Sequence, residues 1–448
     1  MSKLSCIILA AGRGTRMKSD RPKVLHALGG WPMIRHVVKT AEALKADPIV
    51  TVIAPGMDDV TAEVAPHVTA VQEKQLGSGD AARAALPALK NAKGKVLILA
   101  GDVPLLQADT LQALADEMPE GGLSVLGFTP MDPTGYGRLV TDDDLNVLEI
   151  VEDKDASAEQ KSITLCNAGA YCVDAALLPQ LLEKLSNSNA QKEFYLTDIV
   201  KLAASQGKQC AYIEAEPFET IGINSRSQLA EAEGELQNYL RARAMFEGAT
   251  LLDPMTTYFS VDTELGRDVI VEPGVFFGPG VKVADKVTIH AYSYLEGVTV
   301  ETGAEIGPFA RVRPKSHIGE SAVIGNFIEV NRTILKAGAK SKHLSYLGDA
   351  VIGEKANIGA GTVIANYDGF DKLATEVGKG AFVGSNSTLI APVKIGDGAY
   401  VGAASAVAED VPAEALALAR ARTIIRDGWA KIFRSEKQAS KEAKKKAG

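Results

Sequence analysis

The sequence predicts an α/β domain followed by an all-β parallel β-helix. In residues 5–128, short aliphatic runs alternate with helix-like segments, the pattern of a parallel sheet with helices on its faces. Beyond residue 251, aliphatic residues recur every six positions. The chain holds 42 Gly but only 2 Trp, 12 Phe and 11 Tyr, which suits a repetitive aliphatic scaffold. Its 448 residues exceed the size at which single cores stop growing, so at least two domains are expected.

The first half supplies five strand candidates and one clear helix. The strands are predicted at residues 6–10, 49–53, 68–72, 96–100 and 123–128. Between the first two, apolar residues fall on one helical face, namely Met33, Ile34, Val37, Val38, Ala41 and Leu44. Pro32 stands where a first helical turn tolerates proline.

An amphipathic segment marks the domain boundary. Within residues 226–247, Leu229, Leu236, Leu240 and Phe246 recur on an otherwise charged stretch without proline. We therefore expect a first domain over 1–225, a linker helix over 226–249 and a second domain over 250–448.

The second half has a six-residue period in four runs. The recurring residues are Leu265, Val271, Phe277, Val283, Ile289 and Leu295; Ile306, Val312, Ile318, Ile324 and Val330; Ile352, Ile358 and Ile364; and Val377, Val383, Leu389, Ile395, Val401 and Val407. This period fits short strands joined by tight corners, each placing one aliphatic side chain inward. The resulting prism has flat faces that favour a homotrimer. On the repeat alone, a bare scaffold is as good an interpretation as a catalytic domain.

Composition and charge exclude several classes of protein. The net charge of −8 argues against nucleic-acid binding. No run of 18 apolar residues or leader pattern occurs, so we expect no membrane insertion and a cytoplasmic protein. Cys6, Cys166, Cys172 and Cys210 lack metal-ligand spacing and are interpreted as buried thiols. The Lys-rich end is expected to be disordered from about residue 435.

A glycine-rich basic loop follows the first strand. Residues 9–17 read LAAGRGTRM, which matches neither a Walker A loop nor the dinucleotide pattern, because Met17 occupies the third glycine position. Cationic side chains gather in residues 13–23, namely Arg13, Arg16, Lys18, Arg21 and Lys23. Such a loop at a strand's carboxyl end suits a polyanion such as a nucleoside triphosphate. The alternative is an ordinary glycine turn with surface charges.

Four further residues are candidates for chemistry. Asp102 follows the strand predicted at 96–100, where a carboxylate can hold Mg²⁺ or simply cap a turn. His343 and Tyr346 lie in the first break of the six-residue period, between Val330 and Ile352, and Lys372 lies in the second, between Ile364 and Val377. A lone histidine is more often structural, but breaks in a regular scaffold are where function is usually placed.

These motifs together resemble a known family. The strings LAAGRGTRM, RPKVL at 21–25, QLGSG at 75–79, GDVP at 101–104, DPTGYGR at 132–138 and EFYLTD at 193–198 are similar to those of sugar-1-phosphate nucleotidyltransferases. With the hexapeptide repeats, residues 4 to about 430 resemble the bacterial bifunctional N-acetylglucosamine-1-phosphate uridyltransferase/glucosamine-1-phosphate acetyltransferases. The resemblance implies a Rossmann-like, GT-A-type nucleotidyltransferase domain and a left-handed β-helix. It also implies acetyl transfer from acetyl-CoA to glucosamine-1-phosphate, then uridylyl transfer from UTP with Mg²⁺.

The resemblance assigns roles to residues by position. For uridylyl transfer it implies Arg16 and Lys23 as catalytic residues and Asp102 and Asn224 as Mg²⁺ ligands. The implied UTP and sugar-phosphate contacts are Leu9, Ala10, Gly12, Lys23, Gln72, Gly77, Ser78, Gly137, Glu152, Asn167 and Asn224. For acetyl transfer it implies His343 as general base. The implied glucosamine-1-phosphate contacts are Arg313, Asn331, Tyr346, Asn357 and Lys372, and the acetyl-CoA contacts are Ala360, Asn366, Tyr367, Ser385, Ala403 and Arg420.

The sequence departs from the family pattern at three positions. Ser78 and Ala100 stand where Thr and Tyr are expected, and Asn331 stands where the family typically has a phosphate-binding lysine. An amide cannot replace that charge, so we hypothesise that Arg332 or Arg313 compensates. A single-activity nucleotidyltransferase with a trimerising or regulatory β-helix, and a non-enzymatic nucleotide-sugar sensor, remain the alternatives.

Overall fold

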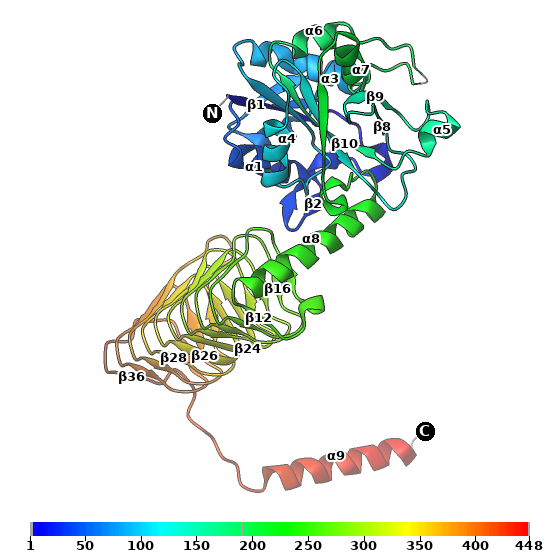
Figure 1. The fold of residues 1–448 in the computed structure, drawn as a ribbon. Coiled ribbons are helices and arrows are strands. Elements are labelled where there is room, and N and C mark those ends of the chain that lie inside the picture. The colour runs from blue at the N-terminus through cyan, green and yellow to red at the C-terminus, as the bar shows by residue number, and fades with distance from the viewer. Residues whose placement is uncertain (1–2, 190, 447–448) are drawn as a thin grey trace. The chain divides into compact units, whose positions relative to one another are not determined.

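The computed structural model describes residues 3–189 and 191–446 and divides into two compact units. The first extends to Glu247 and includes the short segments Tyr258–Thr263 and Phe277–Gly280. The second comprises Gly248–Thr257, Glu264–Phe276 and the chain from Val281 onward. The ribbon in Figure 1 passes from an α/β fold, coloured blue to green, to stacked coils coloured green to orange.

The first unit is built on a mostly parallel sheet. Its strand order is β11-β7-β10-β6-β1-β4-β5, with β8 and β9 joined through β10. The predicted strands are observed as β1 (Leu4–Leu9), β4 (Ile49–Ile53), β5 (Val68–Val71), β6 (Lys95–Ala100) and β7 (Leu123–Phe128). The strands β8 (Arg138–Thr141), β9 (Val147–Val151), β10 (Cys166–Asp174) and β11 (Cys210–Glu214) were not predicted. The α/β fold class is confirmed.

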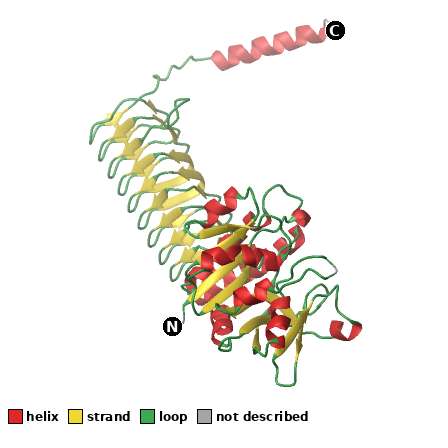
Figure 2. Cartoon of the chain, turned by 90° about the horizontal axis from the view of Figure 1, so that it is seen from above, coloured by secondary structure: helices red, strands yellow, loops and turns green. Residues whose placement is uncertain are grey.

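Helices cover both faces of this sheet (Figure 2). One buried cluster joins Cys6 and Ile8 of β1 to α1 (Met33–Ala43), α2 (Asp58–Val64) and α4 (Ala108–Asp116). The other joins Ile7 to α3 (Ser78–Ala85), α6 (Leu178–Glu183) and α7 (Asp198–Ser205). Because neighbouring strand residues point to opposite faces, β1 supplies both cores. Its carboxyl end is therefore held rigidly where the glycine-rich loop begins.

Short elements complete this unit. They are β2 (Ala27–Leu28), β3 (Trp31–Pro32), α5 (Ala158–Lys161) and the 3₁₀ turns η1 (Thr15–Met17), η2 (Lys23–Leu25), η3 (Leu86–Leu89) and η4 (Pro217–Thr220). The long helix α8 (Arg226–Phe246) lies within the range predicted for the linker helix. The Ser225 side chain caps it by accepting a hydrogen bond from the Gln228 backbone N–H.

The second unit is a left-handed parallel β-helix, as predicted. It consists of short strands arranged in successive coils, with the turn η5 (Pro254–Thr256) near the start. Two segments of the first coils, Tyr258–Thr263 and Phe277–Gly280, are counted with the first unit. The strands before the first break are β12 (Thr250–Leu251), β13 (Tyr258–Phe259), β14 (Glu264–Leu265), β15 (Ile270–Val271), β16 (Phe276–Phe277), β17 (Lys282–Val283), β18 (Thr288–Ile289), β19 (Tyr294–Leu295), β20 (Val298–Val300), β21 (Glu305–Ile306), β22 (Arg311–Val312), β23 (Ser316–Ile318) and β24 (Val323–Asn331). The rest are β25 (Ile334–Leu335), β26 (Lys340–Gly348), β27 (Ala350–Ile352), β28 (Asn357–Ile358), β29 (Val363–Ala365), β30 (Thr375–Val377), β31 (Phe382–Val383), β32 (Thr388–Ile390), β33 (Val393–Ile395), β34 (Tyr400–Val401), β35 (Ala406–Val407) and β36 (Leu416–Ala417).

The six-residue pattern marks the inner wall of these coils. Every residue of the four predicted runs is buried except Leu265, which is half-buried in β14. Equivalent positions on successive coils pair in parallel, as Ile318 with Leu335 and Leu335 with Ile352. The first predicted break is filled by β26, which pairs along its length with β24. His343 and Tyr346, which lie in this break of the six-residue period, belong to β26.

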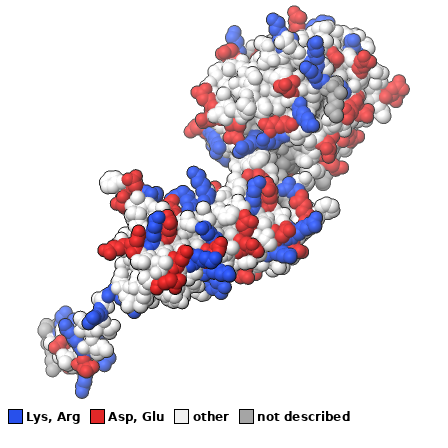
Figure 3. Space-filling model, turned by 90° about the vertical axis from the view of Figure 1, so that its left-hand side faces the viewer, with Lys and Arg blue, Asp and Glu red and all other residues white. Residues whose placement is uncertain are grey.

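Charges of both signs are interspersed on the face of the β-helix that Figure 3 shows. Ion pairs join residues of successive coils, such as Lys282 to Glu264 at 2.8 Å and Lys394 to Glu376 at 3.3 Å. These side chains are largely exposed, so each pair adds little to stability.

The C-terminal segment differs from the sequence expectation. Disorder was expected from about residue 435, but the structure has a helix, α9, over Trp429–Lys446. Its residues are exposed through Lys444, and Ala447 and Gly448 lie outside the described residues. Ala, Lys and Glu are good helix formers, which accounts for a helix in this composition.

The four cysteines are buried free thiols, as predicted. Burial raises the pKa of Cys172 and of Cys210 to about 12, so neither thiol is poised as a nucleophile. Within the described residues, no helix is long and apolar enough to cross a bilayer.

Candidate active sites

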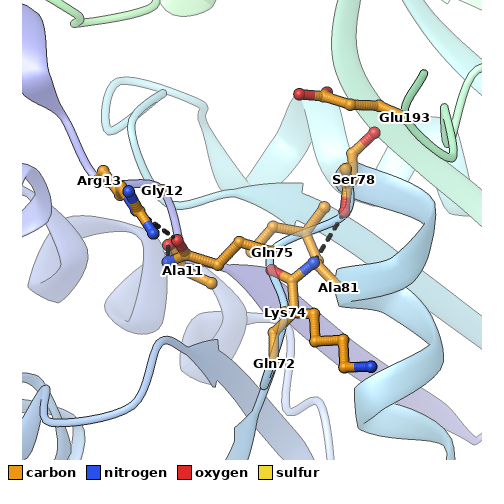
Figure 4. A pocket seen from close by; sticks show the side chains of 11 residues that line it. Ala11, Gly12, Arg13, Gln72, Lys74, Gln75, Ser78, Ala81 and Glu193 are labelled. Atoms are coloured by element: carbon orange, nitrogen blue, oxygen red, sulfur yellow. Dashed lines mark hydrogen bonds between the residues drawn. The ribbon is translucent and has the colours of Figure 1, made fainter. Parts of the chain in front are cut away.

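A pocket of about 450 Å³ opens at the carboxyl end of the first sheet (Figure 4). Five of the predicted UTP contacts line it, namely Leu9, Gly12, Gln72, Gly77 and Ser78. Ala10 is buried behind the wall, at 3% exposure. The glycine-rich loop after β1 and the loop between β5 and α3 thus form the two sides of one cavity.

A hydrogen-bonded bridge links these two loops. Arg13 Nε donates to Gln75 Oε1 at 2.8 Å, and Gln75 Nε2 donates to the Ala11 carbonyl at 2.6 Å. Figure 4 marks both bonds across the pocket. Sequence reasoning noted Arg13 as a cation of the loop and assigned Gln75 no role. An entering polyanion would find the Arg13 guanidinium held at the mouth of the pocket.

Three predicted residues converge beside the glycine-rich loop. The Lys23 ammonium donates to an Asp102 carboxylate oxygen and to Asn224 Oδ1, the latter at 2.9 Å. Lys23 comes from η2, Asp102 from the end of β6 and Asn224 from the segment that precedes α8. Gly14 permits the approach, since its φ is +60° and a Cβ there would lie 2.6 Å from Lys23 Cβ.

The oxygens around Lys23 fit a hard divalent cation. A carboxylate and an amide oxygen are ligands that Mg²⁺ accepts, and both already lie against a cation, the Lys23 ammonium. No cluster of three or more His, Cys, Asp or Glu residues with metal-ligand geometry occurs within residues 3–189 and 191–446. The fit therefore depends on water and phosphate oxygens completing the coordination.

The predicted sugar-phosphate contacts also lie together. The Asn167 backbone N–H donates to the Gly137 carbonyl at 2.8 Å, and a Cβ on Gly137 would lie 3.7 Å from Glu152 Oε2. Burial raises the pKa of Glu152, and a hydrogen bond from Thr197 Oγ1 at 3.2 Å opposes that rise. Thr197 belongs to the EFYLTD string but was given no role.

Arg16 and the hydroxyl of Ser78 have different surroundings. Arg16 is exposed on η1. Ser78 begins α3, and its Oγ accepts a hydrogen bond from the Leu196 backbone N–H at 2.9 Å. The hydroxyl thus ties the pocket wall to the EFYLTD string.

In the β-helix, His343 has one ring nitrogen occupied. His343 Nδ1 lies 3.1 Å from Asn326 Oδ1, and the two residues are paired in the β24–β26 ladder. The amide oxygen can only accept, so in the neutral imidazole the hydrogen lies on Nδ1 and the lone pair on Nε2. His343 is exposed, as a base that must reach a substrate requires. Asn326 was not assigned a role, although the 17-residue coil offset points to it.

A polar network lies beyond His343, where the strands β24 and β26 end. Arg332 donates to both carboxylate oxygens of Asp349, at 2.5 and 2.7 Å, and to Asn331 Oδ1 at 3.2 Å. Asn366 Nδ2 donates to Asp349. The Arg332 hydrogen bonds hold the pKa of Asp349 below its usual range. Asn331 is only 5% exposed, and the cation that contacts it is Arg332.

Gly348 allows Tyr346 and Asn366 to meet at this network. A Cβ on Gly348 would lie 2.6 Å from Tyr346 Oη and 2.7 Å from Asn366 Nδ2. Both distances are shorter than real Cβ contacts, so only glycine leaves these polar atoms in place. Gly348 and Asp349 were noted within the first break but not as site residues.

The other predicted sugar-phosphate contacts are dispersed around the coil. Arg313 forms an ion pair with Glu329 at 2.9 Å, so its charge is already shared. Asn357 begins β28, and its register partners are Lys340 and Phe382. The Lys372 ammonium lies 4.0 Å from the centre of the Tyr367 ring in the loop that fills the second break.

Three of the predicted acetyl-CoA contacts, Ala360, Ser385 and Ala403, lie at linked turns of successive coils. The Asn386 N–H donates to the Ala360 carbonyl at 2.7 Å, and the Ala404 N–H donates to the Ser385 carbonyl at 2.8 Å. Gly384 packs directly against Ala403, which continues the row. Asn366 joins the Asp349 network, Tyr367 projects from the loop, and Arg420 is exposed beyond β36.

Comparison with known proteins finds relatives that match nearly the whole chain. A model of the MobA-like NTP transferase domain family matches residues 6–144. A bifunctional protein GlmU from Paramagnetospirillum magneticum is 48% identical over 447 residues, covering 99% of each chain. A second, from Azorhizobium caulinodans, is 49% identical over 437 residues, covering 96% of this chain and 97% of its own. A putative glucose-1-phosphate thymidylyltransferase from Bacillus anthracis matches 52% of this chain and 94% of its own with 21% identity and a TM-score of 0.43, a likeness too weak to support a conclusion.

The full-length matches cover both candidate active sites, and the domain match covers the glycine-rich loop and Asp102. A nucleotidyltransferase half joined to an acyltransferase half is therefore confirmed, and the scaffold-only and sensor alternatives fall away. The chain belongs to the bifunctional GlmU family of transferases.

Proposed function

We propose that the β-helix transfers acetyl from acetyl-CoA to glucosamine-1-phosphate. The first unit then transfers uridylyl from UTP to the resulting N-acetylglucosamine-1-phosphate and yields UDP-N-acetylglucosamine and pyrophosphate. The observation that carries this proposal is family membership over 99% of the chain, with a built polar site in each half.

In the first unit, the glycine-rich loop and the Gln72–Ser78 wall would hold the nucleotide. A phosphate oxygen of the sugar phosphate attacks the α-phosphorus of UTP, and the bond from that phosphorus to the bridging oxygen of pyrophosphate breaks. Negative charge increases on the phosphate oxygens, so Lys23, Arg16 and Arg13 act by electrostatic stabilisation. Gly137, Glu152 and Asn167 would orient the sugar.

Asp102 and Asn224 are the residues that would hold Mg²⁺. Bound there, the ion would offset the charge of the triphosphate oxygens. The Lys23 ammonium donates to both of these oxygens. On loading, Lys23 would be released toward the phosphates, which gives this lysine two successive partners.

In the β-helix, His343 Nε2 would accept a proton from the amine of glucosamine-1-phosphate. The amine nitrogen then attacks the thioester carbonyl carbon, the carbon–sulfur bond breaks, and coenzyme A leaves as its thiol after protonation. Asn326 keeps the hydrogen on Nδ1 and so leaves Nε2 available. Tyr346 and Asn366, which meet at Gly348, would orient the sugar phosphate and the acetyl group.

Arg332 would take over the charge that Asn331 lacks. Its guanidinium contacts Asn331 Oδ1 at 3.2 Å, and it is paired with Asp349 as Arg313 is with Glu329, so the contact with Asn331 is what favours Arg332. Arginine suits phosphate because its planar fork can bind two oxygens. Arg332 would share its donors between Asp349 and the substrate phosphate.

We also propose a homotrimer in the cytoplasm. An exposed apolar row along one corner of the β-helix supports packing between copies, and it consists of Tyr292, Phe309, Phe327 and Leu344. The Phe309 ring stacks on the Tyr292 ring at 5.3 Å and on the Phe327 ring at 5.2 Å between centroids. Sedimentation equilibrium should give three times 47.2 kDa, and a monomer would contradict the proposal.

Two assays on one preparation test the catalytic proposal. Thiol release is measured with acetyl-CoA and glucosamine-1-phosphate, and pyrophosphate release with UTP, N-acetylglucosamine-1-phosphate and Mg²⁺. His343→Ala should lower thiol release at least about 100-fold and leave pyrophosphate release unchanged. Unchanged thiol release in the variant would remove the general-base role. No thiol release from the wild type would leave a single-activity uridyltransferase.

A further inference from the structure

The Gln72 side chain is a buried polar group in the wall of the nucleotide pocket. Gln72 directly follows β5, and its backbone N–H donates to the Ile53 carbonyl at 2.9 Å. The residue is only 4% exposed, yet it lines the pocket (Figure 4). Its amide orientation therefore decides which hydrogen-bonding group a ligand meets there.

Both amide hydrogens of Gln72 are already used. Nε2 donates to the Gly77 carbonyl at 3.0 Å and to Asp80 Oδ2 at 2.7 Å. A carbonyl and a carboxylate can only accept, so the orientation with Nε2 toward them is fixed by chemistry. No donor within residues 3–189 and 191–446 reaches Oε1. Gln72 thus offers a ligand an acceptor and no donor.

Asp80 holds this orientation from outside the pocket. It lies in the first turn of α3, is half-buried and does not line the cavity. Asp80 Oδ2 also accepts from the Leu76 N–H at 3.3 Å, which fastens the loop between β5 and α3. A hydrogen bond to a charged group is stronger than one to a neutral carbonyl. The contact with Asp80 therefore fixes the orientation of the Gln72 amide more strongly than the contact with Gly77 does.

An acceptor at this position distinguishes pyrimidine bases. Uracil carries a hydrogen on N3, which can donate to Gln72 Oε1. Cytosine has a lone pair on N3, which would face the oxygen and leave both acceptors unpaired. Sites that hydrogen-bond a substrate group reject analogues lacking it far better than sites that only fit a shape.

We propose that Asp80 is a specificity-determining positioning residue, which holds the Gln72 amide oxygen toward the base and so selects pyrimidine nucleotides that carry a hydrogen on N3. The inference rests on the proposed uridylyl transfer. It adds a residue that touches no substrate and acts through Gln72.

The test compares UTP with CTP on the full-length chain. The ratio of kcat/KM for the two nucleotides is measured by pyrophosphate release, with N-acetylglucosamine-1-phosphate and Mg²⁺. In Asp80→Ala the ratio should fall about tenfold, because the amide can turn its nitrogen toward N3 of cytosine. Asp109→Ala, which removes an exposed acid from the first turn of α4, should leave the ratio unchanged. A ratio in Asp80→Ala within twofold of the wild type would overturn the proposal.

Two further measurements separate the possible failures. Thiol release by the β-helix of the same preparation checks that the chain is folded. If Asp80→Ala is unstable, Asp80→Asn replaces it; this variant retains an accepting oxygen and should keep most of the UTP-to-CTP ratio of kcat/KM. Calorimetric binding of UTP and CTP with Mg²⁺ gives the same ratio without turnover. If the wild type binds UTP more tightly than CTP but releases no pyrophosphate, the proposed uridylyl transfer is wrong. The role of Asp80 is then tested by the ratio of the two binding affinities in Asp80→Ala. Binding of neither nucleotide would overturn both.

Discussion

Gly348→Ala is expected to damage acetyl transfer selectively. The added Cβ would lie 2.6 Å from Tyr346 Oη and 2.7 Å from Asn366 Nδ2, whereas ordinary contacts begin near 3.4 Å. The two side chains must therefore move by about 0.8 Å to restore van der Waals distances. A displacement of about 1 Å at a reacting centre can cost about 100-fold in rate, so we expect kcat/KM for acetyl transfer to fall between about 10- and 100-fold.

The assay compares the two activities of one chain. Thiol release should fall as stated, pyrophosphate release should not change, and the free energy of unfolding should drop by about 1 kcal/mol, because side-chain ends can yield more readily than backbone. Gly234→Ala is the matched control, since its Cβ would meet nothing within 4 Å, and both activities should persist. Full acetyl transfer by Gly348→Ala would refute the claim that Tyr346 and Asn366 must meet at this point.

Three more outcomes are expected, each with the other activity of the preparation as control. Asn326→Ala should lower kcat/KM of acetyl transfer about tenfold, because the His343 ring loses the hydrogen-bond acceptor at Nδ1 that orients it; an unchanged kcat/KM would contradict the role of the Asn326 contact. Asp102→Asn should lower pyrophosphate release at least about 100-fold and raise the Mg²⁺ concentration for half-maximal rate, and wild-type Mg²⁺ dependence would argue against its role. Arg332→Gln should raise KM for glucosamine-1-phosphate about tenfold and lower the free energy of unfolding by about 1 kcal/mol at neutral pH. Because Arg332 lowers the pKa of Asp349, that difference should be complete above about pH 4 and vanish as the pH falls through the lowered pKa; a difference that persists in stronger acid would refute the ion pair as its cause.

The sequence was most informative where one physical pattern repeats. The six-residue period identified the inner wall of the β-helix because each coil buries the same position, and only Leu265, near the start, is half-buried. The strands β1, β4, β6 and β7 were located within one or two residues, since continuous aliphatic runs mark strands buried on both faces.

Strands without such runs were missed. The strand β10 contains Asn167 and Gly169, and its pairing with β7 shifts register between Asn167 and Tyr171. Residues of this kind favour a loop in local sequence, and only pairing with neighbouring strands makes them part of a sheet.

In the candidate sites too, residues in local motifs could be predicted, whereas contacts between distant segments could not. Motifs supplied Lys23 and Asp102, and the family resemblance supplied Asn224. The carboxyl ends of parallel strands explain why Lys23 and Asp102 could be expected near one edge. Arg332 and Asp349 are 17 residues apart, the same coil offset that joins Asn326 to His343, but the ion pair itself follows only once the register of β24 with β26 is known. The orientation of Gln72 likewise depends on a contact with Asp80 that no spacing rule specifies.

The loop that fills the second break has a consequence for how this scaffold tolerates change. Paired positions on neighbouring coils are 17 residues apart from Leu335 to Ile352 but 25 apart from Ile352 to Val377, and the parallel pairing is the same in both. The surplus is accommodated entirely outside the prism. Lengthening or shortening that corner should therefore vary substrate contacts while the paired strands on either side keep their alignment.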